Sequence, residues 1–211
     1  MKIILVLFLT GFFFYVPFLS ISPESGPKLS RTQKKELIRF AREIGAKRIQ
    51  YAQAWTPAGE SKPWIMDCSN TVRYTFKAMF HLTLPRTSYD QYQFALQKGV
   101  FYPVNMDTKS GKIDADRLIR ELRTGDILFW IDTYSVQVEP PVSHVMVYLG
   151  KNASNQMKMF GAGTFGRGEQ TTAGGLDVYP FDPNQKIGCV KNSKGSCIRN
   201  SRFIGYARFL N

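Results

Sequence analysis

The spacing of apolar residues changes character midway along the chain. In the first half, apolar side chains recur every three or four residues, which predicts helices. The first helix should follow Ser30, where the letters S-R-T-Q form a capping box, and should end near Gly45. A second helix is expected to begin near Cys68, and a third should cover 87–96.

The second half is built from short runs of β-branched and aromatic residues, which are typical of strands. A brief helical turn at 118–122 should precede them. The strands are expected at 126–131, 142–149, 157–162 and 203–209, with a hairpin turn at 150–155. Helices followed by an antiparallel meander predict an α+β fold, in which N-terminal helices pack on a small antiparallel sheet.

The N-terminus carries eighteen uncharged residues, from Ile3 to Ser20, directly after Met1-Lys2. A short basic start followed by an apolar stretch and small residues is typical of an export signal, here assigned to 1–22. An uncleaved N-terminal anchor is the alternative, because eighteen helical residues almost span a bilayer. A Pro- and Ser-containing linker at 23–29 would then lead into one domain at 30–211. Under either interpretation the domain lies outside the cytoplasm, in the periplasm, the cell envelope or the medium.

Composition and charge narrow the range of partners. The chain of 211 residues has 44% hydrophobic and 21% charged residues, which excludes a disordered or multi-span membrane protein. Its net charge of +12 favours a polyanion or an acidic surface. For an exported domain, an anionic envelope polymer fits this charge better than nucleic acid does. Membrane contact is expected only through an uncleaved N-terminal segment, and the domain is expected to be a monomer.

Two of the three cysteines lie close together near the end of the chain. Cys189 and Cys197 flank the turn Lys194-Gly195, and thiols outside the cytoplasm tend to pair. A local disulfide between them is therefore predicted. With no histidine nearby, these two cysteines make a poor metal site.

The third cysteine, Cys68, has the context of a nucleophile. It lies between a polar loop and the first turn of a predicted helix, where free N–H groups and the helix dipole stabilise a thiolate. The alternative is a buried structural cysteine. Of the two histidines, His81 is thirteen residues along the same helix, about 20 Å away. His144, at the start of a predicted strand, is left as the general base.

Four sequence blocks, in order, resemble the NlpC family of papain-like cysteine endopeptidases that cut peptidoglycan. They are D-C-S-N-T-V-R-Y-T-F, L-P-R-T-S-Y-D-Q, L-R-T-G-D-I-L-F-W and S-H-V-M-V-Y-L-G. The resemblance implies a papain-like fold, with Cys68 as nucleophile and His144 as base. It implies neither a metal nor a cofactor.

The resemblance also assigns residues around the nucleophile. Asp67 and Ser69 match the flanks of the family cysteine, which shape the substrate site, and Tyr51 resembles an upstream tyrosine that reaches into the active site. Arg86 belongs to the second block, where a structural role and substrate contact are both open. Gly161 stands where the family has a third polar catalytic residue, whose loss should slow catalysis without abolishing activation of the nucleophile.

These observations predict an exported cysteine endopeptidase that hydrolyses amide bonds in peptidoglycan stem peptides or crosslinks. Two alternatives stay open. One is a basic envelope-binding module that kept the fold and lost activity, which Gly161 and the positive charge favour. The other is an acyltransferase that uses the same Cys68 and His144 pair.

Overall fold

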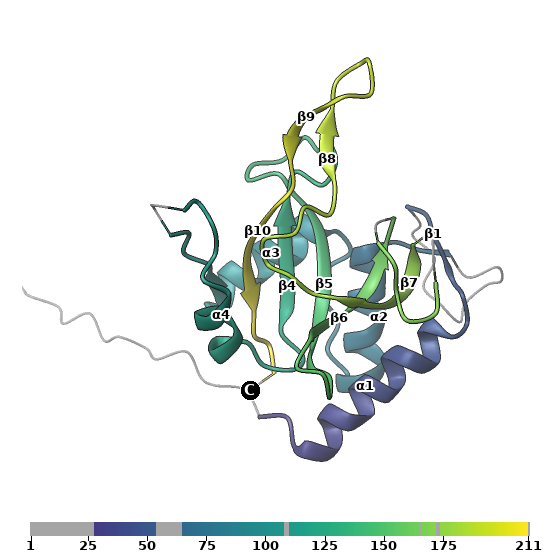
Figure 1. Cartoon of the computed structure of the whole chain (residues 1–211). Coiled ribbons are helices and arrows are strands. Elements are labelled where there is room, and N and C mark those ends of the chain that lie inside the picture. Colours follow the sequence, from purple (N-terminus) through teal and green to yellow (C-terminus); the bar gives the residue numbers. More distant parts are fainter. Residues whose placement is uncertain (1–27, 54–64, 108–109, 165, 172–173, 211) are drawn as a thin grey trace, which may run out of the picture.

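The computed structural model describes residues 28–53, 65–107, 110–164, 166–171 and 174–210 (Figure 1). The helices within these ranges are α1 (Arg31–Gly45), α2 (Cys68–Phe80), α3 (Ser88–Gln97) and α4 (Ala115–Glu121). They coincide within a few residues with the helices that the apolar spacing predicts.

A six-stranded antiparallel sheet forms the centre of the molecule. Its order is β3-β10-β4-β5-β6-β7, so β10, the last strand along the chain, lies between β3 and β4. These strands are β3 (Phe101–Pro103), β4 (Ile127–Ile131), β5 (Val142–Lys151), β6 (Met157–Gly163), β7 (Gly175–Pro180) and β10 (Arg202–Ala207). The predicted α+β class is confirmed. Strands β3 and β7 were not predicted.

Two small sheets flank the main one. Strands β1 (Gln50–Tyr51) and β2 (Ile65–Met66) pair in parallel, and β8 (Cys189–Lys191) pairs antiparallel with β9 (Cys197–Asn200). The β8–β9 hairpin projects from one end of the main sheet (Figure 1).

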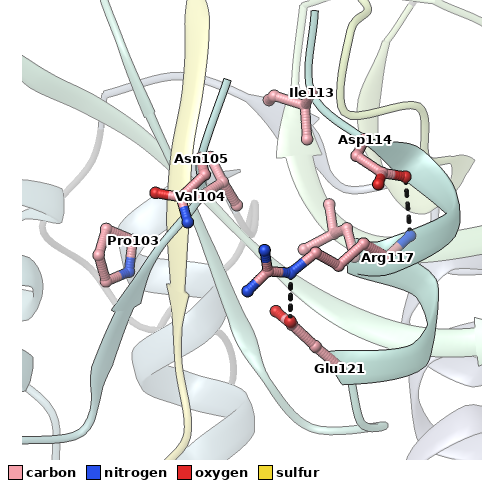
Figure 2. Close-up of a pocket in the computed structure, with 8 residues that line it drawn as sticks. Pro103, Val104, Asn105, Ile113, Asp114, Arg117 and Glu121 are labelled. Carbon is pink, nitrogen blue, oxygen red and sulfur yellow. Dashed lines mark hydrogen bonds and ion pairs between the residues drawn. The ribbon is translucent and has the colours of Figure 1, made fainter. Parts of the chain in front are cut away.

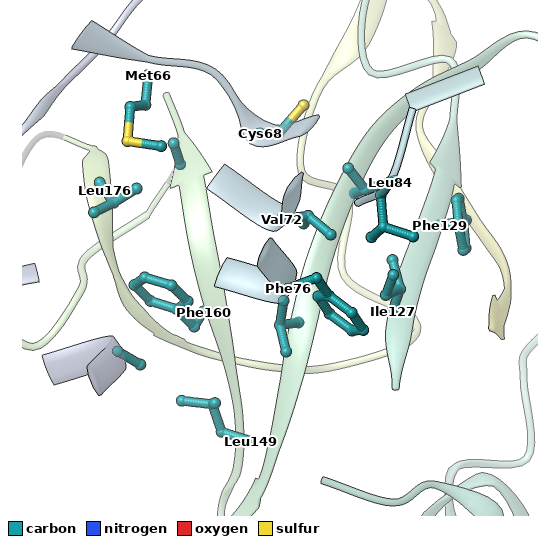
Figure 3. Close-up of a cluster of buried hydrophobic side chains, with 14 of the residues drawn as sticks. Met66, Cys68, Val72, Phe76, Leu84, Ile127, Phe129, Leu149, Phe160 and Leu176 are labelled. Atoms are coloured by element: carbon teal, nitrogen blue, oxygen red, sulfur yellow. The ribbon is translucent and has the colours of Figure 1, made fainter. Parts of the chain in front are cut away.

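The two faces of the sheet are buried in two separate hydrophobic clusters. The first cluster lies between the sheet and helices α1 and α2, and Figure 3 shows its side chains, including Val72, Phe76 and Phe160. The second cluster covers the opposite face and contains Trp130 and Met146. Because both faces are buried, strand residues of either parity are apolar.

Helix α1 begins as its sequence predicts. The Ser30 hydroxyl accepts a hydrogen bond from the Gln33 N–H, and the Gln33 side chain accepts one from the Ser30 N–H, which completes the capping box. Leu37 and Ala41 then face the first hydrophobic cluster. This packing holds α1 against the sheet.

A buried ion pair joins Arg208, which follows β10, to Asp126, which precedes β4. Arg208 Nε donates to Asp126 Oδ1 at 2.9 Å and Arg208 Nη2 donates to Asp126 Oδ2 at 2.8 Å. Arg208 Nη2 also donates to the Glu121 carbonyl. Both charged side chains are more than nine-tenths buried, so each depends on the other for its polar partners.

A hollow of about 40 Å³ lies between β3 and α4 (Figure 2). Hydrogen bonds join three of the residues that line it, Arg117, Asp114 and Glu121. The Arg117 backbone N–H donates to Asp114 at 2.9 Å, and its guanidinium donates to Glu121 at 3.0 Å. This hollow is a surface feature of α4 and lies apart from the cysteine.

The predicted signal or anchor at 1–22 and most of the linker at 23–29 fall outside the described residues. Among the helices that are described, none is both long and apolar enough to cross a bilayer. The division of the chain into these segments stays a prediction.

Candidate active site

Cys68 is the first residue of α2, as the sequence predicts. Asp67 precedes it in extended conformation and caps the helix by accepting a hydrogen bond from the Asn70 N–H at 2.7 Å. The Cys68 side chain is buried, with 3% of its surface exposed, at the end of the cluster that also holds Val72 and Phe76 (Figure 3). The thiol is therefore fixed by the helix start.

Asp67, Ser69 and Arg86 form a connected polar group around the helix start. Ser69 Oγ donates to Asp67 Oδ1 at 3.1 Å. Arg86 Nη1 donates to Asp67 Oδ1 at 3.1 Å and to Ser69 Oγ at 3.0 Å, while Arg86 Nη2 forms a close ion pair with Asp67 Oδ2. Arg86, whose role the sequence leaves open, thus connects the start of α3 to the cysteine.

A cavity of about 120 Å³ opens beside the cysteine. Side chains from four segments surround it, and the described residues that line it are Tyr51, Gln53, Asp67, Cys68, Ser69, Arg86, Thr87, Ser88 and Tyr134. The predicted residues Tyr51, Asp67 and Ser69 are therefore brought together with Cys68. The parallel pairing of β1 with β2 places Tyr51 opposite Met66, two residues before the cysteine.

The surroundings of Cys68 favour the neutral thiol. Burial, and after it the negative charge of Asp67, raise the pKa of Cys68 to about 12, although the Val145 and Ser69 N–H groups and Arg86 act in the opposite direction. The helix start was expected to lower this pKa. Burial and the Asp67 carboxylate outweigh the helix because the sulfur has little contact with water.

His144 lies beside this region on β5, and its side chain is on the other face of the sheet. It pairs across the strands with Trp130, and the two rings lie 5.9 Å apart, on the side of the second hydrophobic cluster. The next residue, Val145, faces the first cluster together with Cys68. His144 is not among the described residues that line the cavity. Burial lowers the pKa of His144 to about 3, so its imidazole is neutral.

The third predicted position, Gly161, lies on β6 against Met146 of β5. A Cβ built on residue 161 would clash with the Met146 sulfur, so a side chain at 161 has no room in this packing. The Met146 side chain therefore fills the space that a third polar catalytic residue would need.

The predicted disulfide is present. Cys189 and Cys197 are joined and close the β8–β9 hairpin, with their Cα atoms 5.6 Å apart. This bond is consistent with an exported protein. Cys68 is the remaining cysteine and is free.

Clusters of three or more His, Cys, Asp or Glu side chains able to hold a metal ion are absent from the described residues.

Four residues that line the cavity were not assigned to the site from the sequence: Gln53, Thr87, Ser88 and Tyr134. Tyr134 comes from the loop after β4, and only the tertiary fold brings that loop to the cysteine. The residues around Tyr134 show neither helical nor strand periodicity, so no local sequence pattern predicts that Tyr134 belongs to the site.

The model of the NlpC/P60 family matches residues 53–162, a region that contains Cys68, His144 and Gly161. The chain belongs to the NlpC/P60 family, a family of the cysteine peptidase kind with a papain-like fold. No curated protein matches the chain.

Two examples among the solved structures that resemble the chain have low sequence identity to it. One is a protein from Staphylococcus aureus described as similar to lipoprotein, of the NLP/P60 family, with 18% identity and a TM-score of 0.45 over 87% of this chain and 45% of that one. The other is a cellulosome-related module from Ruminococcus flavefaciens described as resembling papain-like cysteine peptidases. It has 11% identity and a TM-score of 0.49, over 86% of this chain and 89% of that one. The chain thus spans less than half of the Staphylococcus structure.

Proposed function

We propose that this protein is an exported cysteine endopeptidase that hydrolyses amide bonds in peptidoglycan stem peptides or crosslinks. The observation that carries the proposal is the position of Cys68 at the start of α2, open to a polar cavity, in a chain of the NlpC/P60 family. A cysteine in this position is the nucleophile of acyl transfer.

In the proposed reaction, the Cys68 thiolate attacks an amide carbonyl of the peptide stem. The carbonyl oxygen takes the negative charge of the tetrahedral intermediate and is held by the Cys68 backbone N–H, one of the first-turn groups without an acceptor inside the helix. The C–N bond then breaks, and the amine leaves with one proton. Water attacks the thioester, which releases the carboxylic acid and restores the thiol.

We assign His144 as the group that takes the thiol proton and returns it to the leaving amine. Support comes from its position next to Val145, whose backbone N–H acts on the Cys68 sulfur. To act as base, a His144 ring nitrogen must come within hydrogen-bond reach of that sulfur. In the described structure the His144 ring lies on the other face of the sheet beside Trp130, so this role requires β5 to rearrange at His144.

The cavity favours a small polar part of a peptide as the group bound next to the thiol. Its volume of about 120 Å³ is below that of sites for drug-sized ligands, and its lining carries hydroxyl, amide, carboxylate and guanidinium groups. The disulfide and the net charge of +12 support action in the envelope, where anionic polymers lie.

The test is the release of stem peptides from purified peptidoglycan by the oxidised domain. Wild type should release new amino termini and free stem fragments, and Cys68→Ala should release none. Cys68→Ser serves as a matched variant because it keeps the size of the side chain. Equal release by wild type and Cys68→Ala would overturn the assignment of the nucleophile.

A second candidate function is a basic envelope-binding module without catalysis. Met146 in the place of a third polar residue, together with the neutral states of Cys68 and His144, favours it. This function predicts that the protein sediments with cell walls in a salt-dependent way and that Cys68→Ala binds as wild type does. Salt-dependent binding to cell walls without release of stem peptides would support the binding module over the endopeptidase.

A further inference from the structure

The loop after β4 carries Tyr134 into the Cys68 cavity. Tyr134 and Tyr51 both line this cavity together with Cys68, and the charges of Cys68, Asp67 and Arg86 all act on the Tyr134 phenol. The Gln53 side chain forms a hydrogen bond with it. Burial raises the pKa of Tyr134 to about 12, so at neutral pH the phenol is a hydrogen-bond donor beside the thiol.

The backbone of this loop is held from two sides. The Thr133 N–H and Thr133 Oγ1 both bond to Ser143 Oγ, at 2.9 and 2.8 Å. Ser143 is fully buried on β5, next to His144. Asp132 has a left-handed backbone, with φ at 58°, and its N–H donates to the Pro141 carbonyl at 3.2 Å. These contacts fix the direction in which Tyr134 leaves the sheet.

The second support comes from the disulfide-closed hairpin. Arg199 of β9 donates from Nε to Asp132 Oδ1 at 2.8 Å, and the Asp132 side chain is 8% exposed. Gly188, just before β8, packs so closely on the Thr133 carbonyl that a Cβ there would clash. Ser201 Oγ in turn accepts from the N–H groups of Ile187 and Gly188. The hairpin base therefore contacts the two residues that precede Tyr134.

We propose that Tyr134 is a substrate-positioning residue of the Cys68 cavity, and that the β8–β9 hairpin holds it there through Arg199 and Asp132. The phenol donates a hydrogen bond to a carbonyl or hydroxyl group of the peptide bound next to Cys68. The substrate part of this inference rests on the proposed function. The positioning part rests only on the contacts of the loop and the hairpin.

The positioning is tested by the rate at which iodoacetamide alkylates Cys68 in the oxidised protein, where Cys68 is the free thiol. Arg199→Ala and Tyr134→Ala should each accelerate alkylation severalfold, because each opens the cavity. The double variant should be no faster than Tyr134→Ala, since Arg199 acts through Tyr134. Arg199→Lys should recover most of the wild-type rate.

Lys194→Ala is the matched control, because it removes a cation from the exposed tip of the same hairpin. It should leave the rate unchanged. Circular dichroism and thermal unfolding show whether each variant is folded at the assay temperature. The nearly isosteric Asp132→Asn tests the same contact with less disturbance. Folded Arg199→Ala and Asp132→Asn proteins with wild-type rates would overturn the proposal, and so would global unfolding of both.

The substrate role is tested with Tyr134→Phe, which keeps the ring and removes the hydroxyl. KM for stem-peptide cleavage should rise between about three- and tenfold with kcat nearly unchanged, which is the effect of one uniformly lost hydrogen bond. Tyr102→Phe, a change at a more exposed tyrosine on β3, should leave KM unchanged. An unchanged KM in Tyr134→Phe would overturn the substrate role. Absence of cleavage by wild type would count against the proposed function, while the alkylation rates would still decide the positioning.

Discussion

Met146 on β5 lies against Gly161 on β6, and its sulfur lies so close that it would clash with a Cβ on residue 161. Glycine at position 161 is therefore required by its neighbour and not by its backbone, whose φ lies outside the positive range that favours glycine. The loss of a third polar residue and the presence of a large side chain at 146 are two parts of one packing arrangement.

Gly161→Ala should destabilise the domain by about 1–3 kcal/mol, the usual cost of overpacking a filled core. The second change Met146→Ala should recover part of the loss made by Gly161→Ala, because it vacates the contested space. Urea unfolding of the two single variants and the double variant measures this coupling. Additive effects would show that the two side chains do not compete.

The alkylation rate of Cys68 should rise about tenfold per pH unit from pH 7 to pH 10 without reaching a plateau. The reason is that burial and Asp67 raise the pKa of this thiol to about 12, so the thiolate is a minor species throughout this range. Reaction with iodoacetamide, followed by mass spectrometry, gives the profile. A plateau below pH 8 that disappears in His144→Ala would instead demonstrate a thiolate–imidazolium pair.

Asp67→Asn should accelerate this alkylation at pH 8. The change removes the negative charge that raises the pKa of Cys68 and leaves the Arg86 guanidinium beside the sulfur. Asparagine also caps helices well, so α2 should keep its start. Asp114→Asn alters the cap of α4, away from the cysteine, and is the control that should have no effect.

The stability of the domain should fall as the pH drops below 6.5. His144 has a pKa of about 3 in the folded state and 6.5 as a free side chain, so in this window the unfolded chain binds a proton that the folded chain does not. The free energy of unfolding should therefore decrease by up to about 1.4 kcal/mol per pH unit between pH 6.5 and 3 through this residue. Urea unfolding at several pH values measures the slope.

His144→Phe should flatten that slope because it removes the titrating ring and keeps a planar side chain beside Trp130. His81→Asn changes the other histidine, which is exposed at the end of α2, and should leave the slope as in wild type. An unchanged slope in His144→Phe would contradict the buried neutral state.

Arg208→Ala should lower the free energy of unfolding by about 3–5 kcal/mol, because it leaves the Asp126 carboxylate buried without its cation. Arg117→Ala breaks a solvent-screened pair with Glu121 and should lower the free energy of unfolding far less. Thermal unfolding of the two variants compares them directly. Similar losses of unfolding free energy in the two variants would show that burial does not determine how much the Arg208–Asp126 pair stabilises the domain.

The sequence predicts the parts of this fold that depend on local signals. The capping box at Ser30 and the helix start at Cys68 are formed by neighbouring residues, so their positions are confirmed within a residue or two. Strands β1, β3 and β7 have two to six residues each and exist because of partners elsewhere in the chain. No local period marks them.

The residues of the candidate site divide in the same way, into those that the local sequence predicts and those that only packing brings together. Cys68, Asp67 and Ser69 are adjacent, and their shared cavity follows from one helix start. The face of the sheet on which His144 lies could not be predicted. Strand β5 is apolar on both faces, so its sequence shows no polar and apolar alternation that would distinguish them. Tyr134 and Arg86 reach the cavity from separate segments, a proximity that only packing determines.

The place of β10 between β3 and β4 has a consequence for how the protein is made. Strand β3 pairs only with β10 within the main sheet, and β4 needs β10 to cover one of its edges. Pairings between segments this far apart in the chain form slowly, and a nascent chain shorter than about 200 residues cannot form them. During synthesis the domain therefore stays incompletely folded until β10 has emerged. A chain in that condition can still be threaded through a membrane pore, which a finished sheet could not pass.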